Sequence, residues 1–299
     1  MQIGFIGLGK MGLNMARNVA DQNWQVIGLD ANQEARKTAA SFGIETVDSV
    51  DKLLLTLSGR RMIFLSTPAG KITNGLVEEL VSKLDEGDIL IDSGNSNFHD
   101  SQKNYQLAKA HGVSFIDCGT SGGMQGARNG ACLMIGGDKA AFKIAEPFFR
   151  DLACEQGYLY AGKAGSGHYL KMVHNGIEYA MMQAIGEGFH LLEKADYSFD
   201  LKEVAKVWNH GSIIEARLMA LAEEAFAADP HLETIKGEVD ASGEAKWTVE
   251  EALKHDIPVP TIALSLFVRE ESKIPDSFSN KVVSSLRHGF GGHAMVKSN

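Results

Sequence analysis

The segment from Lys171 to Tyr179 places a base, an acid and two polar side chains within nine residues. At about 100° per residue, Lys171, His174, Asn175 and Glu178 stand at i, i+3, i+4 and i+7, so a helix would carry all four on one face. An amine and a carboxyl two turns apart can bracket a small bound molecule, one accepting a proton while the other donates one. We therefore predict that Lys171 and Glu178 form an acid–base pair on a single helix.

A solvated face of Lys and Glu is the ordinary alternative for such residues. The glycines of this segment argue against it, because Gly165 and Gly167 open the segment and Gly176 interrupts the polar stripe. Glycine inside a helix costs about 1 kcal/mol relative to alanine. We interpret Gly176 as a position where another group must approach the helix backbone closely.

The composition bounds the class of protein. The chain has 299 residues, 44% of them hydrophobic, which is enough for a substantial core and for two domains. Its net charge of -9 disfavours nucleic acids and anionic membrane surfaces as partners, since both require a basic footprint. No apolar run reaches the roughly 18 residues of a membrane-spanning helix, and the N-terminus enters a strand without a basic leader. We expect a cytoplasmic protein.

The cysteines are few and irregularly placed. Cys118, Cys132 and Cys154 show no metal-ligand spacing, and an odd number fits a disulfide framework poorly. We predict reduced structural thiols and no metal site.

Short apolar runs alternate with helical patterns through the first half of the chain. The predicted strands are residues 3–6, 25–29, 62–66, 89–92 and 114–117. Such alternation is typical of βαβ units, so we predict an α/β domain over residues 1–162 with a Rossmann-type, doubly wound and mostly parallel sheet. Beyond Gly162 the strand signals fade, which predicts an all-helical substrate and oligomerisation domain over residues 163–299.

The C-terminal run from Arg287 to His293 is rich in glycine and histidine. A run of this kind is not expected to pack as a helix by itself. It is either a frayed terminus or a tail that docks into a site.

A nucleotide-binding motif, Gly7-Leu8-Gly9-Lys10-Met11-Gly12, follows the first predicted strand and opens a helical pattern. In this context the glycines make a tight turn and let backbone N–H groups approach a pyrophosphate at the helix N-terminus. We predict that these six residues bind a dinucleotide. A glycine turn without a ligand is the alternative.

Asp30 ends the second predicted strand about 20 residues downstream, where a carboxylate accepts hydrogen bonds from the ribose hydroxyls. A 2′-phosphate would be repelled by that carboxylate, and Ala31 and Asn32 offer no adjacent cation. Arg36 lies about a turn further on and could reach such a phosphate. The sequence therefore favours NAD and disfavours NADP without excluding it.

Two polar, glycine-containing segments accompany later strands. Residues 92–96 include Asn95, and residues 120–123 include Ser121, Gly122 and Gly123. We expect both segments to follow their strands at the carboxyl edge of the sheet, where open α/β sheets bind ligands. Their hydroxyl, amide and backbone donors suit a carboxylate or hydroxyls, although either segment alone is more often an ordinary loop.

The whole chain resembles the 6-phosphogluconate dehydrogenases, specifically their short branch of roughly 300 residues. The most specific elements are Gly165-Ser-Gly-His168-Tyr-Leu-Lys171-Met-Val-His174-Asn175-Gly-Ile-Glu178-Tyr179, Lys246-Trp-Thr248 and Arg287-x-x-Phe290-Gly-x-His293. The opening glycine motif is less specific, because β-hydroxyacid dehydrogenases in general share it. By this resemblance the substrate is 6-phosphogluconate, within the pentose phosphate pathway and gluconate metabolism.

The resemblance implies a role for each matched position. Lys171 would be the general base and Glu178 the general acid. The carboxylate and hydroxyls of the sugar acid would be held by Asn95, Ser121, Gly122, Gly123, His174 and Asn175, with Asn95 also at the cofactor. The phosphate would be bound by Tyr179, Lys246, Thr248, Arg269, Arg287 and His293. Without the resemblance, the scattered cations among these would be assigned to the solvated surface.

The implied reaction oxidises the C3 hydroxyl to a ketone, after which the β-keto acid loses CO₂. Lys171 must start neutral to accept the hydroxyl proton, which burial favours, and Glu178 would protonate C1 to give ribulose 5-phosphate. The C-terminal tail comes from a neighbouring subunit in the longer relatives, so a homodimer or homotetramer is expected. Asp30-Ala31 replaces the Asn-Arg of those relatives, and the helical domain here is much shorter.

Two rival functions remain. A β-hydroxyacid dehydrogenase that reduces a semialdehyde without decarboxylation would need the same lysine but neither Glu178 nor a phosphate cluster. A dinucleotide sensor without catalysis would need neither member of the acid–base pair.

Overall fold

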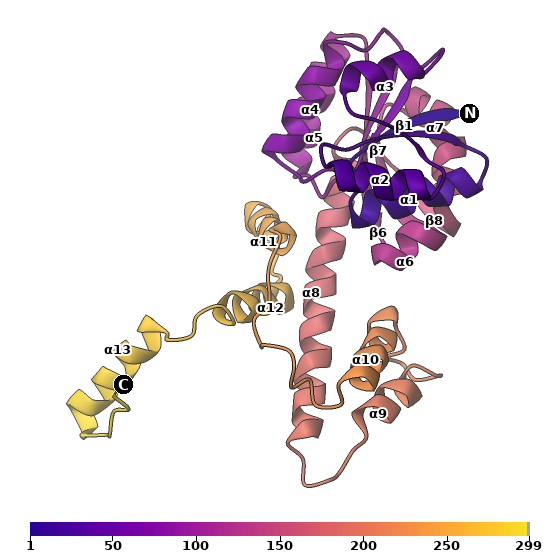
Figure 1. The fold of residues 1–299 in the computed structure, drawn as a ribbon. Coiled ribbons are helices and arrows are strands. Elements are labelled where there is room, and N and C mark those ends of the chain that lie inside the picture. The colour runs from indigo at the N-terminus through magenta and orange to yellow at the C-terminus, as the bar shows by residue number, and fades with distance from the viewer. Residues whose placement is uncertain (298–299) are drawn as a thin grey trace. The chain divides into compact units, whose positions relative to one another are not determined.

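The computed structural model describes residues 1–297, and its N-terminal part is one sheet with helices on both faces (Figure 1). The strands are β1 (Gln2–Ile6), β2 (Gln25–Leu29), β3 (Glu45–Val47), β4 (Met62–Leu65), β5 (Ile89–Asp92), β6 (Ser114–Ser121), β7 (Ala131–Gly137) and β8 (Ala153–Gly162). The helices between them are α1 (Lys10–Asp21), α2 (Gln33–Ser41), α3 (Val50–Thr56), α4 (Lys71–Val81), α5 (Phe98–Ala110), α6 (Gly123–Asn129) and α7 (Lys139–Leu152).

The strands are ordered β3-β2-β1-β4-β5-β6-β7-β8. Every neighbouring pair is parallel except β6 and β7, which are antiparallel. The predicted doubly wound, mostly parallel sheet is therefore confirmed. The chain moves outward from β1 to β3 and then returns to the other side of β1 at β4, so the topological switch point, where such sheets bind ligands, lies between β1 and β4.

All five predicted strands form, but one extends further than expected. Since β6 continues through Thr120 and Ser121, these two residues end a strand and do not follow one, which corrects the prediction. The extension arises because β7 pairs with β6 as far as Ser121, opposite Cys132. The strands β3, β7 and β8 were not predicted.

Two apolar clusters cover the two faces of the sheet. One face packs under α1, α6 and α7 and includes the aromatic group of Phe5, Phe64 and Phe148. The other packs under α3, α4 and α5, with Leu53 and Leu80 fully buried. Helices on both faces fix the position of each strand end, and with it the loops that follow.

The chain divides into two compact units, residues 1–175 and 176–299. Helix α8 (Ser166–Glu193) begins in the first unit and continues into the second. The remaining helices of the second unit are α9 (Leu201–Trp208), α10 (Arg217–Ala228), α11 (Glu244–Lys254), α12 (Pro260–Glu271) and α13 (Phe278–Gly291). Up to residue 297 the second unit contains helices and no strand, as predicted.

The second unit has two small apolar clusters. Phe189 of α8 packs with Trp208 and Phe226 at ring-centroid distances of 5.6 and 4.8 Å. Tyr179 of α8 packs with Ala245 of α11 and Leu266 of α12. These clusters fix α9 to α12 around the part of α8 that belongs to this unit.

Helix α13 differs from the others because none of its residues is buried. It includes Arg287, Phe290 and Gly291, so the expectation that this polar, glycine-rich run would not be helical is wrong. Ser277 begins the helix by accepting a hydrogen bond from the backbone N–H of Asn280, and the left-handed Gly292 ends it. None of the helices within residues 1–297 is both long and apolar enough to cross a membrane.

Candidate active site

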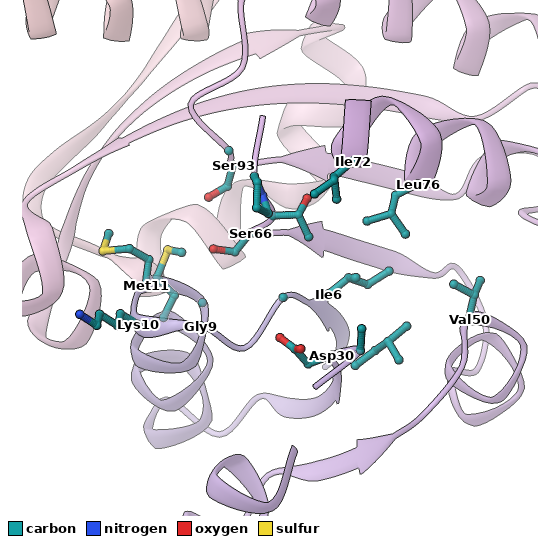
Figure 2. Close-up of a pocket in the computed structure, with 18 of the residues that line it drawn as sticks. Ile6, Gly9, Lys10, Met11, Asp30, Val50, Ser66, Ile72, Leu76 and Ser93 are labelled. Atoms are coloured by element: carbon teal, nitrogen blue, oxygen red, sulfur yellow. The ribbon is translucent and has the colours of Figure 1, made fainter. Parts of the chain in front are cut away.

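A pocket of about 1000 Å³ opens beside the loops that follow β1, β2, β4 and β5 (Figure 2). The residues predicted to bind the dinucleotide that line it are Gly7, Gly9, Lys10, Met11, Gly12, Asp30 and Asn95. Leu8 does not line the pocket, because its side chain is buried in the core. The pocket lies at the switch point of the sheet, which is where a nucleotide would bind.

The glycines of the first loop fit a dinucleotide for three separate reasons. Gly7 has φ +94°, and a Cβ there would lie 2.3 Å from the carbonyl oxygen of Ser66. A Cβ at Gly12 would lie 2.0 Å from the carbonyl oxygen of Gly7. A Cβ at Gly9 would meet no protein atom within 4 Å, so the space beside this backbone is open to a ligand. Gly9 begins α1 without a side-chain cap, which leaves backbone donors for a pyrophosphate.

Asp30 joins the first loop to the end of β2. Its carboxylate accepts hydrogen bonds from the backbone N–H of Leu8 and of Asn32, both at 2.7 Å. A carboxylate has about four acceptor positions, so capacity remains for ribose hydroxyls. The Arg36 guanidinium donates to the carbonyl oxygens of Asp30 and Ala31, at 2.6 and 3.1 Å. It is thereby held against the backbone of this turn.

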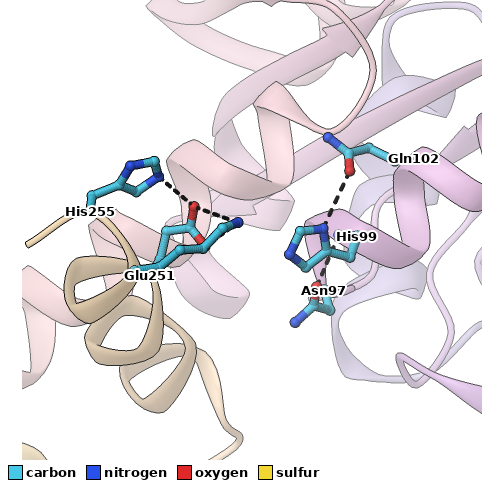
Figure 3. Close-up of polar contacts among 6 residues, drawn as sticks. Asn97, His99, Gln102, Glu251 and His255 are labelled. Atoms are coloured by element: carbon cyan, nitrogen blue, oxygen red, sulfur yellow. Dashed lines mark hydrogen bonds and ion pairs between the residues drawn. The ribbon is translucent and has the colours of Figure 1, made fainter.

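Asp92 organises the loop that contains Asn95. This fully buried carboxylate accepts hydrogen bonds from the backbone N–H of Gly94 at 3.0 Å and from the hydroxyl of Ser96 at 2.8 Å. The next helix, α5, is capped by Asn97, whose side chain accepts a hydrogen bond from the backbone N–H of His99 (Figure 3). Asn95 is thus held at the rim of the pocket between a buried anchor and a helix cap.

Asp117 of β6 organises the start of α8, as Asp92 organises its loop. It is fully buried and accepts hydrogen bonds from the backbone N–H of Gly165 at 2.7 Å and of His168 at 3.0 Å. A carboxylate at a helix N-terminus satisfies unpaired donors and complements the helix dipole. The side chain of His168 is also anchored, with Nδ1 2.7 Å from the hydroxyl of Ser101.

Lys171 is placed by these anchors within a cluster of polar side chains. It is buried at 6% exposure, and its Nζ lies 3.4 Å from Nδ1 of His174. Nδ1 of His174 is also 3.0 Å from the side-chain oxygen of Asn175, and Nε2 is 3.1 Å from the hydroxyl of Ser121. Three residues predicted to hold the sugar acid therefore contact one another around the predicted base.

Gly119 brings α8 against β6 at this point. A Cβ on Gly119 would lie 2.5 Å from Cβ of Lys171 and 2.9 Å from the carbonyl oxygen of Gly167. Any other residue would push the helix, and with it the lysine, away from the strand. The neighbouring Gly122 and Gly123 both have positive φ, +117° and +60°, and form the turn into α6.

In the second unit, Tyr179 and Arg269 form a contact pair. The guanidinium of Arg269 lies 3.4 Å from the centroid of the buried Tyr179 ring, and one of its nitrogens donates to the carbonyl oxygen of Asp240 at 3.3 Å. Glu178 stands next to Tyr179 on α8 and is half-buried. Stacking on an aromatic ring holds a guanidinium in a fixed direction, which suits anion recognition.

Thr248 of α11 lies against Gly176 of α8. A Cβ on Gly176 would be 2.9 Å from Cγ2 of Thr248, so the close approach predicted at this glycine is confirmed. The Thr248 hydroxyl donates to the carbonyl oxygen of Glu244 at 2.9 Å. Lys246 is exposed, with an ion pair to Glu250 at 3.9 Å.

The other end of α11 is fixed by Glu251, which contacts His255 at 2.9 Å and Lys254 at 3.4 Å (Figure 3). Burial raises the pKa of Glu251, but hydrogen bonds from His255 and Lys254 outweigh it and leave that pKa below its usual value. His255 and Lys254 therefore favour the ionised carboxylate of Glu251 at the last turn of α11.

Arg287 and His293 line a separate, smaller pocket of about 200 Å³ at α13, together with Asn280, Val283, Ser284 and Ala294. The six predicted phosphate ligands thus fall into three local groups within the second unit: Tyr179 with Arg269, Lys246 with Thr248, and Arg287 with His293. Across residues 1–297 there is no group of three or more side chains suited to a metal ion.

Four anchors of the site were not predicted from the sequence: Asp92, Asp117, Gly119 and His168. A signal existed for the two aspartates, because each is the last residue of a predicted apolar strand. A carboxylate at such a position is buried only when backbone or hydroxyl donors meet it. Gly119 carries no comparable signal in one sequence.

Comparisons with known proteins identify the family of the chain. The model of the NAD binding domain of 6-phosphogluconate dehydrogenase matches residues 2–162, and that of the 6-phosphogluconate dehydrogenase C-terminal domain matches residues 167–286. YqeC of Bacillus subtilis (strain 168), whose name as a 6-phosphogluconate dehydrogenase is provisional, is 50% identical over 99% of this chain and 100% of its own length. An NAD(+)-dependent, decarboxylating 6-phosphogluconate dehydrogenase of Haloferax volcanii is 42% identical over 99% of each chain.

Among solved structures, the 6-phosphogluconate dehydrogenase of Plasmodium falciparum superposes with a TM-score of 0.83 at 28% identity, covering 100% of this chain and 66% of that one. A 3-hydroxyisobutyrate dehydrogenase of Mycobacterium tuberculosis superposes with a TM-score of 0.73 at 22% identity, covering 96% and 99%, which shows a shared fold. The family models and the relatives together cover nearly the whole chain. The chain belongs to the 6-phosphogluconate dehydrogenase family.

Proposed function

We propose that the protein oxidises 6-phosphogluconate with NAD and decarboxylates the product to ribulose 5-phosphate and CO₂. The observation that carries this proposal is the contact of His174 with both the buried Lys171 and Ser121. Ser121 directly follows Thr120, which lines the dinucleotide pocket. A base and a set of hydroxyl and amide donors therefore stand beside the pocket, as oxidation of a hydroxy acid requires.

In the proposed reaction Lys171 accepts the proton of the C3 hydroxyl. Bound NAD supplies the hydride acceptor for this oxidation. Lys171 then returns its proton to the C3 oxygen as CO₂ leaves and an enediol forms. Glu178 protonates the enediol at the carbon that becomes C1 of the product, while Lys171 takes the proton back from the former C3 oxygen, which gives the ketone of ribulose 5-phosphate. Positioned proton transfer of this kind contributes about 10²–10⁴-fold to a rate.

Helix α8 supports this division of roles. It is continuous through both positions, and residues seven apart on a helix share one face. Asp117 and Gly119 fix the helix at Lys171, so the base is positioned by the sheet. The carboxylate and hydroxyls of the substrate are assigned to Asn95, Ser121, Gly122, Gly123, His174 and Asn175.

The phosphate is assigned to the three local groups of the second unit. Tyr179 and Arg269 support this most directly, because the ring orients the guanidinium. Thr248, Lys246, Arg287 and His293 add donors of the kind that phosphate oxygens accept. The tail residues Arg287 and His293 are proposed to act within a homodimer or homotetramer.

The preference for NAD rests on Asp30. Its carboxylate is held by Leu8 and Asn32 at the pocket wall, where it would accept from ribose hydroxyls and repel a 2′-phosphate. Arg36, the nearest candidate to offset that charge, is hydrogen bonded to backbone carbonyls of the same turn.

The test is an assay of purified protein with 6-phosphogluconate and NAD that follows NADH and CO₂ together. We expect equal amounts of both products. Formation of NADH without CO₂ would favour a non-decarboxylating β-hydroxyacid dehydrogenase. Binding of NAD without turnover of 6-phosphogluconate or of a semialdehyde would favour a dinucleotide sensor. Either result would overturn the proposal.

A further inference from the structure

Cys132 lies next to Ser121 on the face of the sheet that contacts α8. The two residues are directly opposite in the antiparallel ladder of β6 and β7, and opposite residues of such a ladder point to the same face. Asp117 and Gly119, which alternate with Ser121 along β6, both contact the start of α8. Cys132 therefore stands beside the cluster of Ser121 and His174.

Cys154 of β8 is the neighbour of Cys132 on its other side. Leu133 of β7 pairs with Tyr158 of β8, so Gly157 stands opposite Cys132, and a Cβ on Gly157 would lie 2.5 Å from Sγ of Cys154. The Cys154 thiol therefore occupies the side-chain position of the residue opposite Cys132. Adjacent strands are about 4.8 Å apart, so the Cys154 thiol that packs on Gly157 lies one strand away from the Cys132 side chain. The strand spacing thus allows a bond between the two thiols.

An irregularity of the ladder falls at these residues. The register moves from Ala131 with Ala153 to Leu133 with Tyr158, so β8 has extra residues immediately after Cys154. Gly130 and Gly157 make room for it: a Cβ on Gly130 would lie 2.7 Å from Cα of Cys154, and one on Gly157 would lie 2.5 Å from its Sγ. The extra residues of β8 thus turn the Cys154 side chain onto Gly157, on the side of Cys132.

The two thiols are exposed, whereas Cys118 is buried. Full burial raises the pKa of the Cys118 thiol and closes it off from a peroxide in solution. Partial burial also raises the pKa of Cys132, the neighbouring Cys154 adds to this, and Lys171 lowers it. Lys171 is thus the neighbouring group that favours the thiolate of Cys132.

We propose that Cys132 and Cys154 are an oxidisable thiol pair, which a hydroperoxide converts to an intrachain disulfide that disturbs Ser121 and weakens binding of the sugar acid. One thiolate attacks the peroxide oxygen, giving a sulfenic acid and releasing hydroxide or alcohol. The second thiol displaces water from that sulfenic acid and forms the S–S bond. Each molecule of peroxide thus removes two electrons in total from the two thiols. The effect on the sugar acid, though not the disulfide itself, rests on the proposed function.

The chemical step is tested on the full-length protein with hydrogen peroxide, followed by peptide mapping without reductant. We expect the peptide of Cys132 joined to that of Cys154, with Cys118 still a thiol and full reversal by dithiothreitol. The reaction should be faster at mildly alkaline than at neutral pH, because the thiolate is the nucleophile. Sulfinic acid on a single cysteine, or disulfides only between chains, would overturn the proposal.

The consequence is tested by kinetics and by a readout that needs no turnover. Oxidation should raise KM for 6-phosphogluconate about tenfold, as expected for one lost hydrogen bond, with KM for NAD unchanged. The imidazole NMR signals of His174, assigned by their loss in His174→Gln, should shift on oxidation. After the same peroxide treatment, Cys132→Ser and Cys154→Ser should show neither the rise in KM nor the shift of the His174 signals.

If the disulfide forms while the His174 signals stay in place, its link to Ser121 is wrong. If those signals shift in a protein that does not release CO₂ from 6-phosphogluconate, the proposed function fails and the thiol pair stands.

Discussion

Lys171 is the residue on which the proposed chemistry depends most. Its buried Nζ lies 3.4 Å from His174, inside the polar cluster that ends at Ser121. Lys171→Met keeps the apolar stem and removes the base, so we expect kcat to fall about 10²–10⁴-fold. NAD binding should be unchanged, because Lys171 does not line the dinucleotide pocket. Steady-state kinetics and a fluorescence titration with NADH measure the two effects. Retention of more than about a tenth of the wild-type kcat would contradict the role of Lys171.

Asp30 is, at the same scale, the residue on which the proposed preference for NAD rests. Asp30→Asn keeps an acceptor for the backbone N–H of Leu8 or Asn32 but removes the negative charge. We expect the ratio of kcat/KM for NAD over NADP to fall about tenfold, equivalent to about 1.4 kcal/mol. Asp48→Asn is the matched control, since Asp48 also lines the pocket but is paired with Lys52 at 2.8 Å. Equal use of both cofactors by the wild-type protein, or equal effects of the two substitutions, would remove the role given to Asp30.

At the scale of elements, the glycines of α8 test how the helix is held. Gly176→Ala would place a methyl group 2.9 Å from Cγ2 of Thr248, whereas Gly186→Ala on the same helix meets nothing within 4 Å. Overpacking costs about 1–3 kcal/mol, which exceeds the gain of about 1 kcal/mol from replacing a helical glycine. We expect Gly176→Ala to lower the free energy of unfolding and Gly186→Ala to raise it. Urea denaturation measures both, and Thr248→Ala should rescue Gly176→Ala. Equal shifts in the two single variants would show that α11 does not constrain α8 at Gly176.

The elements also show what one sequence can and cannot predict. The strands β1, β2, β4 and β5 and the turn at Gly7 follow from apolar runs and glycine spacing, which are local signals. The antiparallel strand β7 and its irregular neighbour β8 depend on pairing with β6, and no local pattern encodes a partner. The face shared by Lys171 and His174 was predicted from helical periodicity. The anchoring of that face by Asp117 and Gly119 was not predicted. These contacts join residues about 50 positions apart, and the spacing of residue types along a chain does not encode contacts over that distance.

For the whole molecule, α13 is the element that the rest of the described chain does not explain. A helix of 14 residues is marginal in water without tertiary packing, yet none of its residues is buried. Phe278, Val282, Leu286 and Phe290 recur every four residues along one face, and Phe278 and Phe290 are 78% and 79% exposed. Exposed apolar faces of this kind mark interaction sites. The family resemblance makes a second copy of the chain the expected partner.

Leu286→Glu places a charge in the centre of the apolar face, so we expect it to shift the protein to a smaller species in size-exclusion chromatography with light scattering. Ser284→Glu adds the same charge on the opposite side of α13 and should leave the size unchanged. It is a control for size alone, because Ser284 lines the small pocket with Arg287 and His293. If Arg287 and His293 act in a neighbouring subunit, Leu286→Glu should also raise KM for 6-phosphogluconate, and higher protein concentration should restore it. A wild-type protein that stays monomeric at assay concentrations would show that α13 has another role and that its tail serves its own chain.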